Sequence, residues 1–123
     1  MDKIKFKFNV DIEVKLTEED IDDIMCSALE GGIGYWCDCA EVVGGKYLGE
    51  YASEQISRGG SLMLHHEDGE NELTIDNLLN GIKRVIVDGR LTVEDGRIDC
   101  GDVDAEIADM IVQYAIFNEL VFG

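Results

Sequence analysis

The sequence predicts a single α+β domain over residues 1–123, with a mostly antiparallel sheet, a long N-terminal strand and helices packed on one face. The first observation behind this is strict alternation of apolar and polar residues over residues 3–16, which is typical of a strand with one face on a core. The second is a set of stretches with helical apolar spacing, two of them opened by a Thr N-cap. The third is short alternating segments joined by Asp-Gly turns.

The composition is strongly acidic, with a net charge of −17. Such a chain repels nucleic acid, so we expect no direct nucleic-acid contact; it either imitates nucleic acid or is simply very soluble. No apolar run approaches the roughly 20 residues of a membrane span, and the N-terminus does not resemble a signal peptide. We therefore expect a cytoplasmic protein with no membrane partner.

The first predicted helix covers residues 18–30. Thr17 is its expected N-cap, with Asp20 in the capping-box position, and Gly31-Gly32 is its expected end. A second strand is expected over residues 37–43. Residues 48–57 have helical apolar spacing but include Gly49, so their structure is left open.

A third strand is predicted over residues 61–67, followed by a hairpin turn over residues 68–71, which the Asp68-Gly69 pair indicates, and a short returning strand at Leu73. Thr74 is the expected cap of the next helix, which Gly89 ends. Residues 91–99 are loop-like with a small hairpin at Asp95-Gly96, and the last helix begins near Asp102 or Asp104.

An apolar tail, Leu120-Val121-Phe122, follows the last helix, and we expect it to pack onto the domain or onto another protomer. The tail and the long first strand together predict a homo-oligomer, dimeric or higher. The four cysteines are Cys26, Cys37, Cys39 and Cys100. Reduced thiols are favoured over a metal site or a disulfide, because the C-x-C pair lacks the second pair of a zinc motif.

Three segments are candidates for ligand contact. Tyr35 and Trp36 follow three glycines and either close the edge of the core or form a stacking wall. Arg58, beside Gly59, Gly60 and Ser61, either holds an anion with the glycine N–H groups or pairs with a local carboxylate.

The third segment is a basic cluster that includes Arg84 and Arg90, which serves either helix-dipole pairing or a ligand across a subunit interface. No catalytic motif occurs in the chain, and no cofactor or resident metal is expected. We therefore expect a binding protein and not an enzyme.

Three strings carry a family resemblance: residues 28–37 (ALEGGIGYWC), residues 51–62 (YASEQISRGGSL) and the ending from Asp109 (DMIVQYA onward). Together they resemble small proteins of Firmicutes phages and prophages, and in length and layout the chain is similar to the first Thoeris anti-defence family. Members of that family are sponges that sequester cyclic ADP-ribose isomers, the messengers of a bacterial immune system, without cleaving them.

The resemblance implies a phage-type anti-defence protein that binds a cyclic nucleotide-type small molecule. The residues place the adenine shelf at Tyr35 and Trp36 and the phosphate clamp at Arg58, so Arg58→Ala is expected to abolish capture. The alternative is an acidic mimic of nucleic acid that inhibits a nuclease, as in anti-CRISPR or anti-restriction proteins. A structural accessory protein of a phage is a third class.

Overall fold

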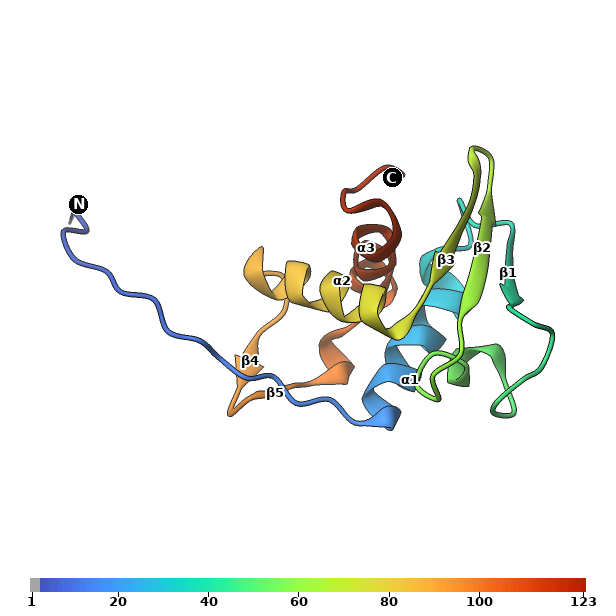
Figure 1. Cartoon of the computed structure of the whole chain (residues 1–123). Coiled ribbons are helices and arrows are strands. Elements are labelled where there is room, and N and C mark those ends of the chain that lie inside the picture. The colour runs from blue at the N-terminus through green and yellow to red at the C-terminus, as the bar shows by residue number, and fades with distance from the viewer. Residues whose placement is uncertain (1–2) are drawn as a thin grey trace.

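The α+β class predicted from the sequence is confirmed by the computed structural model, which describes residues 3–123 (Figure 1). Its helices and strands follow one another in the order α1 (Glu18–Ser27), β1 (Cys39–Val42), β2 (Leu62–His66), β3 (Gly69–Leu73), α2 (Ile75–Val87), β4 (Val93–Glu94), β5 (Arg97–Ile98) and α3 (Ala105–Phe117). None of the helices in this part of the chain is both long enough and apolar enough to cross a membrane.

The first helix begins as its sequence predicts. The Thr17 hydroxyl accepts a hydrogen bond from the N–H of Asp20, and the Asp20 carboxylate accepts one from the N–H of Thr17, which is a complete capping box. Beyond Ser27 the helix continues as a π-helical turn, Ala28–Gly32, that packs against α3. A side chain at Gly32 would lie 2.7 Å from the carbonyl oxygen of Ala105, so this contact requires glycine.

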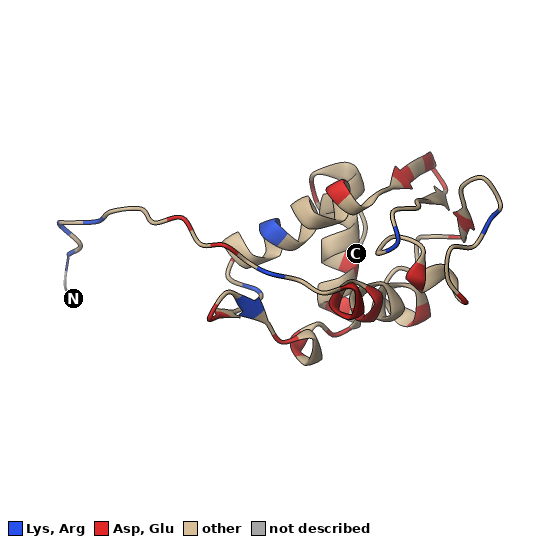
Figure 2. Ribbon diagram, turned by 60° about the horizontal axis from the view of Figure 1, so that its bottom comes forward, with Lys and Arg blue, Asp and Glu red and all other residues tan. Residues whose placement is uncertain are grey.

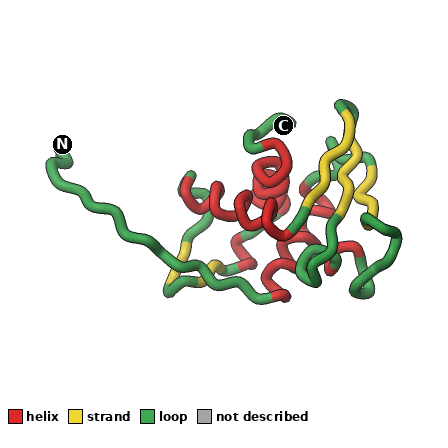
Figure 3. Tube along the Cα trace, in the orientation of Figure 1, coloured by secondary structure: helices red, strands yellow, loops and turns green. Residues whose placement is uncertain are grey.

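The sheet is antiparallel, with β2 between β1 and β3. Leu62 and Leu64 of β2 point to its buried face, while Met63 and His65 point outward. The buried face packs against the helices, which lie on that side of the sheet in Figure 3. His66 pairs with Gly69, so Glu67 and Asp68 form the β2–β3 turn, and Gly69, at φ +135°, begins β3. The turn therefore comes earlier than the predicted one over residues 68–71, because Gly69, Glu70 and Asn71 are paired with β2.

Helices α2 and α3 form the second part of the core. Thr74 and Asp104 cap them by accepting hydrogen bonds from the N–H groups of Asn77 and Ile107. Gly81 of α2 meets the backbone of α3 at Ile111, where any side chain would overlap the Ile111 carbonyl. The two helices therefore approach backbone to backbone at this point.

The predicted long N-terminal strand is wrong. Residues 3–17 are in no strand, and the outer part of this segment runs away from the body in Figure 1. The apolar side chains of this outer part, Ile4 to Ile12, are exposed, from 68% at Val10 to 90% at Phe6. Alternation specifies which face of a strand is apolar, but a strand also needs a neighbour to accept its backbone hydrogen bonds. Within residues 3–123 the three-stranded sheet is complete without this segment.

The base of this N-terminal segment lies against the β4–β5 hairpin, which forms at Asp95-Gly96 as predicted. The N–H of Lys15 donates to the carbonyl of Gly96 at 2.7 Å.

Residues 48–57, left open by the sequence, contain only a short 3-10 turn, Ala52–Glu54. The four cysteines are free thiols, and the described residues contain no cluster of three or more His, Cys, Asp or Glu able to hold a metal.

Candidate functional site

The predicted aromatic pair closes the core around a buried carboxylate. Trp36 is 6% exposed, and its indole N–H donates to Asp109 Oδ1 at 2.7 Å. The Tyr35 hydroxyl donates to Asp109 Oδ2 at 2.6 Å, and the Gln113 amide donates to Oδ1 at 2.9 Å. Three donors on two oxygens compensate the desolvation of Asp109. The pair therefore links the start of the sheet region to α3.

The indole face of Trp36 is covered by the C-terminal tail. Phe122 stacks on Trp36 with ring centroids 5.2 Å apart and an interplanar angle of 6°. The Gln113 side-chain oxygen accepts hydrogen bonds from the N–H groups of Val121 and Phe122, both at 2.8 Å. His66 and Phe117 complete the aromatic cluster edge-on. The face expected to stack on a ligand is thus occupied by the protein's own ring.

The space beside this pair is small and acidic. A cavity of about 260 Å³ is lined by Tyr35, Trp36, Asp38, Glu67, Phe122 and Gly123. Burial of the Tyr35 hydroxyl, together with its hydrogen bond to Asp109 and the charge of that group, raises the pKa of Tyr35 to about 12. Carboxylates at Asp38 and Glu67 with no basic side chain in the lining disfavour an anion here.

The Arg58 loop uses its polar groups within itself. The N–H of Gly59 donates to the Ile56 carbonyl and that of Gly60 to the Gln55 carbonyl, so neither is free to form an anion nest. Arg58 Nη2 lies 3.6 Å from Glu54 Oε2, and Arg58 does not line the cavity beside Tyr35 and Trp36.

The carboxylate of Glu54 accepts hydrogen bonds mainly from backbone N–H groups. N–H groups of Tyr51 and Glu50, and to a lesser degree the charge of Arg58, keep the pKa of Glu54 below its ordinary value. Ser61 contributes its carbonyl to the N–H of Val43 at the start of the sheet. Two interpretations of this loop were open, an anion site and a local ion pair. The structure contains the ion pair between Arg58 and Glu54.

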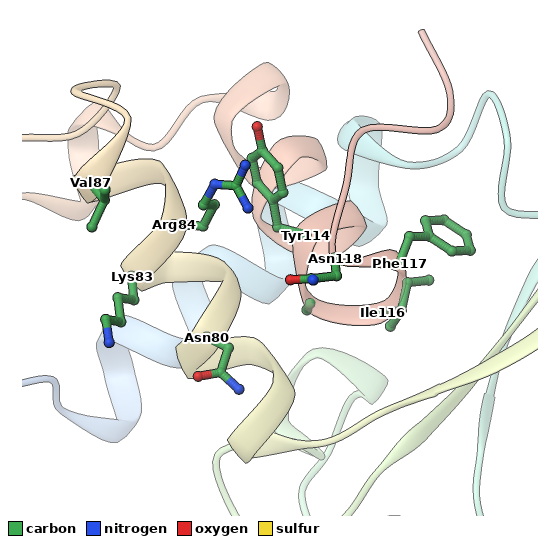
Figure 4. A pocket seen from close by; sticks show the side chains of 9 residues that line it. Asn80, Lys83, Arg84, Val87, Tyr114, Ile116, Phe117 and Asn118 are labelled. Carbon is green, nitrogen blue, oxygen red and sulfur yellow. The ribbon is translucent and has the colours of Figure 1, made fainter.

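The predicted basic cluster has a cavity beside it. Between α2 and α3 lies a cavity of about 480 Å³, within the size range of ligand pockets (Figure 4). The cations Lys83 and Arg84 and the amides Asn80 and Asn118 supply its polar groups. Its remaining lining residues are Val87, Tyr114, Ala115, Ile116 and Phe117.

Arg84 is positioned by two contacts. Its guanidinium carbon lies 4.6 Å from the centroid of the Tyr114 ring, which is a cation–π contact, and its Nε lies 3.4 Å from Asp88. Asp88 also accepts a hydrogen bond from the Tyr114 hydroxyl at 3.1 Å. These contacts hold a planar guanidinium against a planar ring at the wall of the cavity.

Lys83 differs from Arg84 in having no carboxylate within 4.0 Å among residues 3–123. Its charge is available at the cavity, where the C-terminal turns of α2 and α3 would otherwise contribute a negative potential. Arg90, another predicted cation of this cluster, follows Gly89 and is exposed, and it lines neither this cavity nor the one beside Tyr35.

The structure therefore divides the predicted site. Tyr35 and Trp36 line one cavity, Arg84 lines another, and the Arg58 loop lines neither. Sequence reasoning missed Tyr114 and Asn118 as cavity residues, because they belong to a helix that only the fold brings to Arg84. The signal for Asp109 and Gln113 was two polar residues four apart within the otherwise apolar stretch 107–113.

The chain matches no protein-family model, no curated protein and no solved structure.

Proposed function

We propose that this protein binds a small anionic nucleotide in the α2–α3 cavity and sequesters it without cleaving it. The observation that supports the proposal is an unpaired lysine beside an arginine stacked on a tyrosine ring, in a cavity of about 480 Å³. A nucleotide presents a flat base and a charged phosphate, and these are the two groups that such a wall can contact.

Each lining residue has a role in this proposal. Lys83 contacts a phosphate as a point charge, and the Arg84–Tyr114 pair offers a flat surface to the base. The amides of Asn80 and Asn118 supply both donors and acceptors for base or ribose edges. Two charge-assisted contacts, each worth about 1.5–3 kcal/mol, together with stacking support micromolar or tighter binding.

Sequestration without cleavage requires that no acidic or basic side chain act on the bound nucleotide. Asp109 is buried, but three donors engage its oxygens. His65 lies between Glu41 and Glu70 on the sheet, and His66 lies in the aromatic cluster. None of these groups lines the α2–α3 cavity. Asp88 contacts two of its lining residues, but its carboxylate pairs with Arg84 and accepts a hydrogen bond from the Tyr114 hydroxyl, which disfavours it as a general base for the proposed ligand.

The resemblance to the first Thoeris anti-defence family suggests which nucleotides to use as probes. Cyclic ADP-ribose isomers and 3′,5′-cyclic AMP are each incubated with the full chain, and retained ligand is measured by native mass spectrometry. Recovery of the intact nucleotide after denaturation is the expected result. If no probe is retained, or if a hydrolysed product is recovered, the sponge proposal is overturned.

Variants locate the site. Lys83→Ala should weaken binding at least tenfold in calorimetry, because it removes a charge-assisted contact. Lys46→Ala is the matched control, since it changes the net charge equally from an exposed loop outside the cavity. Arg58→Ala should leave affinity unchanged. Loss of binding in Arg58→Ala and not in Lys83→Ala would place the ligand at the glycine loop instead.

An acidic mimic of nucleic acid is the second candidate. It is supported by the exposed carboxylates of α1, Glu18, Glu19 and Asp23, and by the many Asp and Glu positions along the ribbon of the body in Figure 2. A mimic binds a basic nuclease with an affinity that falls steeply with salt and competes with DNA. Such binding, with no retained nucleotide, would favour this candidate over the sponge.

A further inference from the structure

Residues 3–12 form an arm whose apolar side chains have no cover in one copy of the chain. Ile4, Phe6 and Phe8 are 88–90% exposed, and Val10 and Ile12 are 68% exposed. All five lie on alternate residues, so an extended arm presents them on one face. Contiguous exposed apolar surface of this kind marks an interaction site.

The groove that fits this arm lies at its own base. A cavity of about 880 Å³ is bounded on one side by Val10 and Ile12 of the arm and on the other by apolar residues of α2. These residues include Leu79, which is 41% exposed, and Val87, which is 71% exposed. One wall of the groove is thus already made by the arm, and the space beside it is open.

We propose that the occupant is the arm of a second copy, and that two arms pair as an antiparallel ribbon across a twofold axis at Phe8. In this register the partner's Ile4 lies beside Ile12, and the partner's Phe6 lies beside Val10. Both pairs face the groove of α2, so each chain fills the other's cavity. A twofold contact of this kind is self-complementary, since the same surface serves on both sides.

Charge selects this register from its neighbours. With Phe8 on the axis, Lys3 lies opposite the partner's Glu13 and Lys5 opposite the partner's Asp11. Opposite charges in directly paired positions stabilise a strand pair, and like charges destabilise it. Sliding one arm by two residues places Lys7 opposite the partner's Lys7, or Lys3 opposite the partner's Lys15.

A slide by one residue is excluded on other grounds, because it would pair the apolar face with the polar one. With Phe8 on the axis, two kinds of opposite-charge pair form, Lys7 lies opposite the partner's neutral Asn9, and no like charges are opposed. The wider charge distribution agrees with it. The outer arm has lysines at positions 3, 5 and 7, whereas the body is acidic (Figure 2), so a second body attracts the arm.

The pairing also supplies what the predicted strand lacked. Each arm gains a neighbour for its backbone N–H and C=O groups along one edge. The base of the arm already makes one such bond, from Lys15 to the β4–β5 hairpin. The alternation at residues 3–16 then encodes a strand that is completed between chains and not within one.

The first test is cross-linking of the full chain in a Cys39→Ser background, which removes the exposed native thiol. Phe8→Cys should form an intermolecular disulfide at least tenfold faster than Phe6→Cys. The two positions are matched, because the native side chains are 88% and 90% exposed. In the proposed ribbon residue 8 meets its own copy, whereas residue 6 meets the partner's Val10. Equal rates would overturn the register.

The second test is charge reversal, with the dimer dissociation constant measured by analytical ultracentrifugation. K5E and D11K should each weaken the dimer about tenfold, because each creates like-charged pairs at two symmetric sites. The double variant should restore wild-type affinity. D11K is the sharper test, since it makes the whole chain less negative and would tighten a dimer limited only by net charge.

A wild-type chain that is monomeric at all concentrations, or a double variant no tighter than the singles, would overturn the proposal. The emission of the single tryptophan, Trp36, should be unchanged in every variant, because the arm lies outside the aromatic cluster. The groove and the α2–α3 cavity share Lys83 and Val87. The two proposals are nevertheless tested separately, since neither test of the ribbon changes a residue assigned to nucleotide binding.

Discussion

The indole N–H of Trp36 donates a 2.7 Å hydrogen bond to the carboxylate of Asp109, which lies 73 positions later in the chain. This bond joins the segment before the sheet to the last helix. Because Asp109 also accepts from Tyr35 and Gln113, and Gln113 binds the backbone of the tail, one carboxylate organises the C-terminal end of the protein. The proposed ligand cavity uses the same helix, through Tyr114, but none of these hydrogen-bonded groups lines it.

Removing this carboxylate should destabilise the fold. Asp109→Ala leaves the buried donors of Trp36 and Gln113 without an acceptor, and we expect the free energy of unfolding to fall by about 3 kcal/mol. Urea denaturation followed by circular dichroism measures this. Glu106→Ala, an exposed position of the same helix, is the control and should change stability by less than about 0.5 kcal/mol. Equal effects in the two variants would contradict a structural role for Asp109.

The C-terminal tail should depend on the Phe122 ring. Phe122→Ala removes the ring that stacks on Trp36 and should cost about 1–2 kcal/mol of unfolding free energy. Trp36 is the single tryptophan, so its emission should shift to longer wavelength as water reaches the indole. Leu120→Ala, whose native side chain is 44% exposed, should leave the emission unchanged. A Phe122→Ala spectrum identical to wild type would mean that the stack does not shield the indole.

The contact between α2 and α3 should tolerate no side chain at Gly81. Alanine is favoured over glycine within a helix by about 1 kcal/mol, yet Gly81→Ala should destabilise by about 1–3 kcal/mol because its methyl group overlaps the Ile111 carbonyl. Gly34→Ala is the control, since a methyl group there meets nothing within 4 Å. Thermal unfolding compares the two. A stabilised Gly81→Ala variant would show that the helices can separate at no cost, and with them the walls of the α2–α3 cavity.

The phenol of Tyr35 should lose its proton at a higher pH than an ordinary tyrosine. Its pKa is raised to about 12, chiefly by desolvation and then by Asp109, so the neutral phenol is the form that stabilises the fold. That contribution is complete below the phenol's ordinary pKa of 10.0 and is lost as the pH rises through about 12. Tyrosinate absorbance of the wild type minus that of Tyr35→Phe isolates this group. A difference curve with its midpoint near 10 would contradict the hydrogen bond to Asp109.

Local patterns were enough for most elements. Thr17 with Asp20, Thr74 and the Asp95-Gly96 turn each use interactions between residues close in sequence, and the structure contains all of them. The β2–β3 hairpin also forms, but its turn is Glu67-Asp68, because Gly69 is already paired with His66. The prediction that the apolar tail packs was confirmed for Phe122, which stacks on Trp36 of the same chain.

The candidate site was predictable only in fragments. Residues of the right chemistry were recognised at Trp36, Arg58 and Arg84, but their neighbours were not. The Trp36 ring stacks on Phe122 and so has no free face there, and Arg58 pairs with Glu54 and does not line a cavity with the aromatic pair. Arg84 makes a cation–π contact with Tyr114, a residue that no helical or strand periodicity in the sequence relates to it.

By itself, the sequence determined the fold class, the caps and turns of the elements, and the alternation of the N-terminal arm, because each depends on short-range geometry. Only the tertiary structure decided that the arm has no partner strand among residues 3–123 and that Asp109 takes the hydrogen bonds of the aromatic pair. The physical reason is that a strand edge, a buried carboxylate and a stacking face are each completed by groups distant in the chain. Which distant group arrives is settled by the packing of the whole molecule.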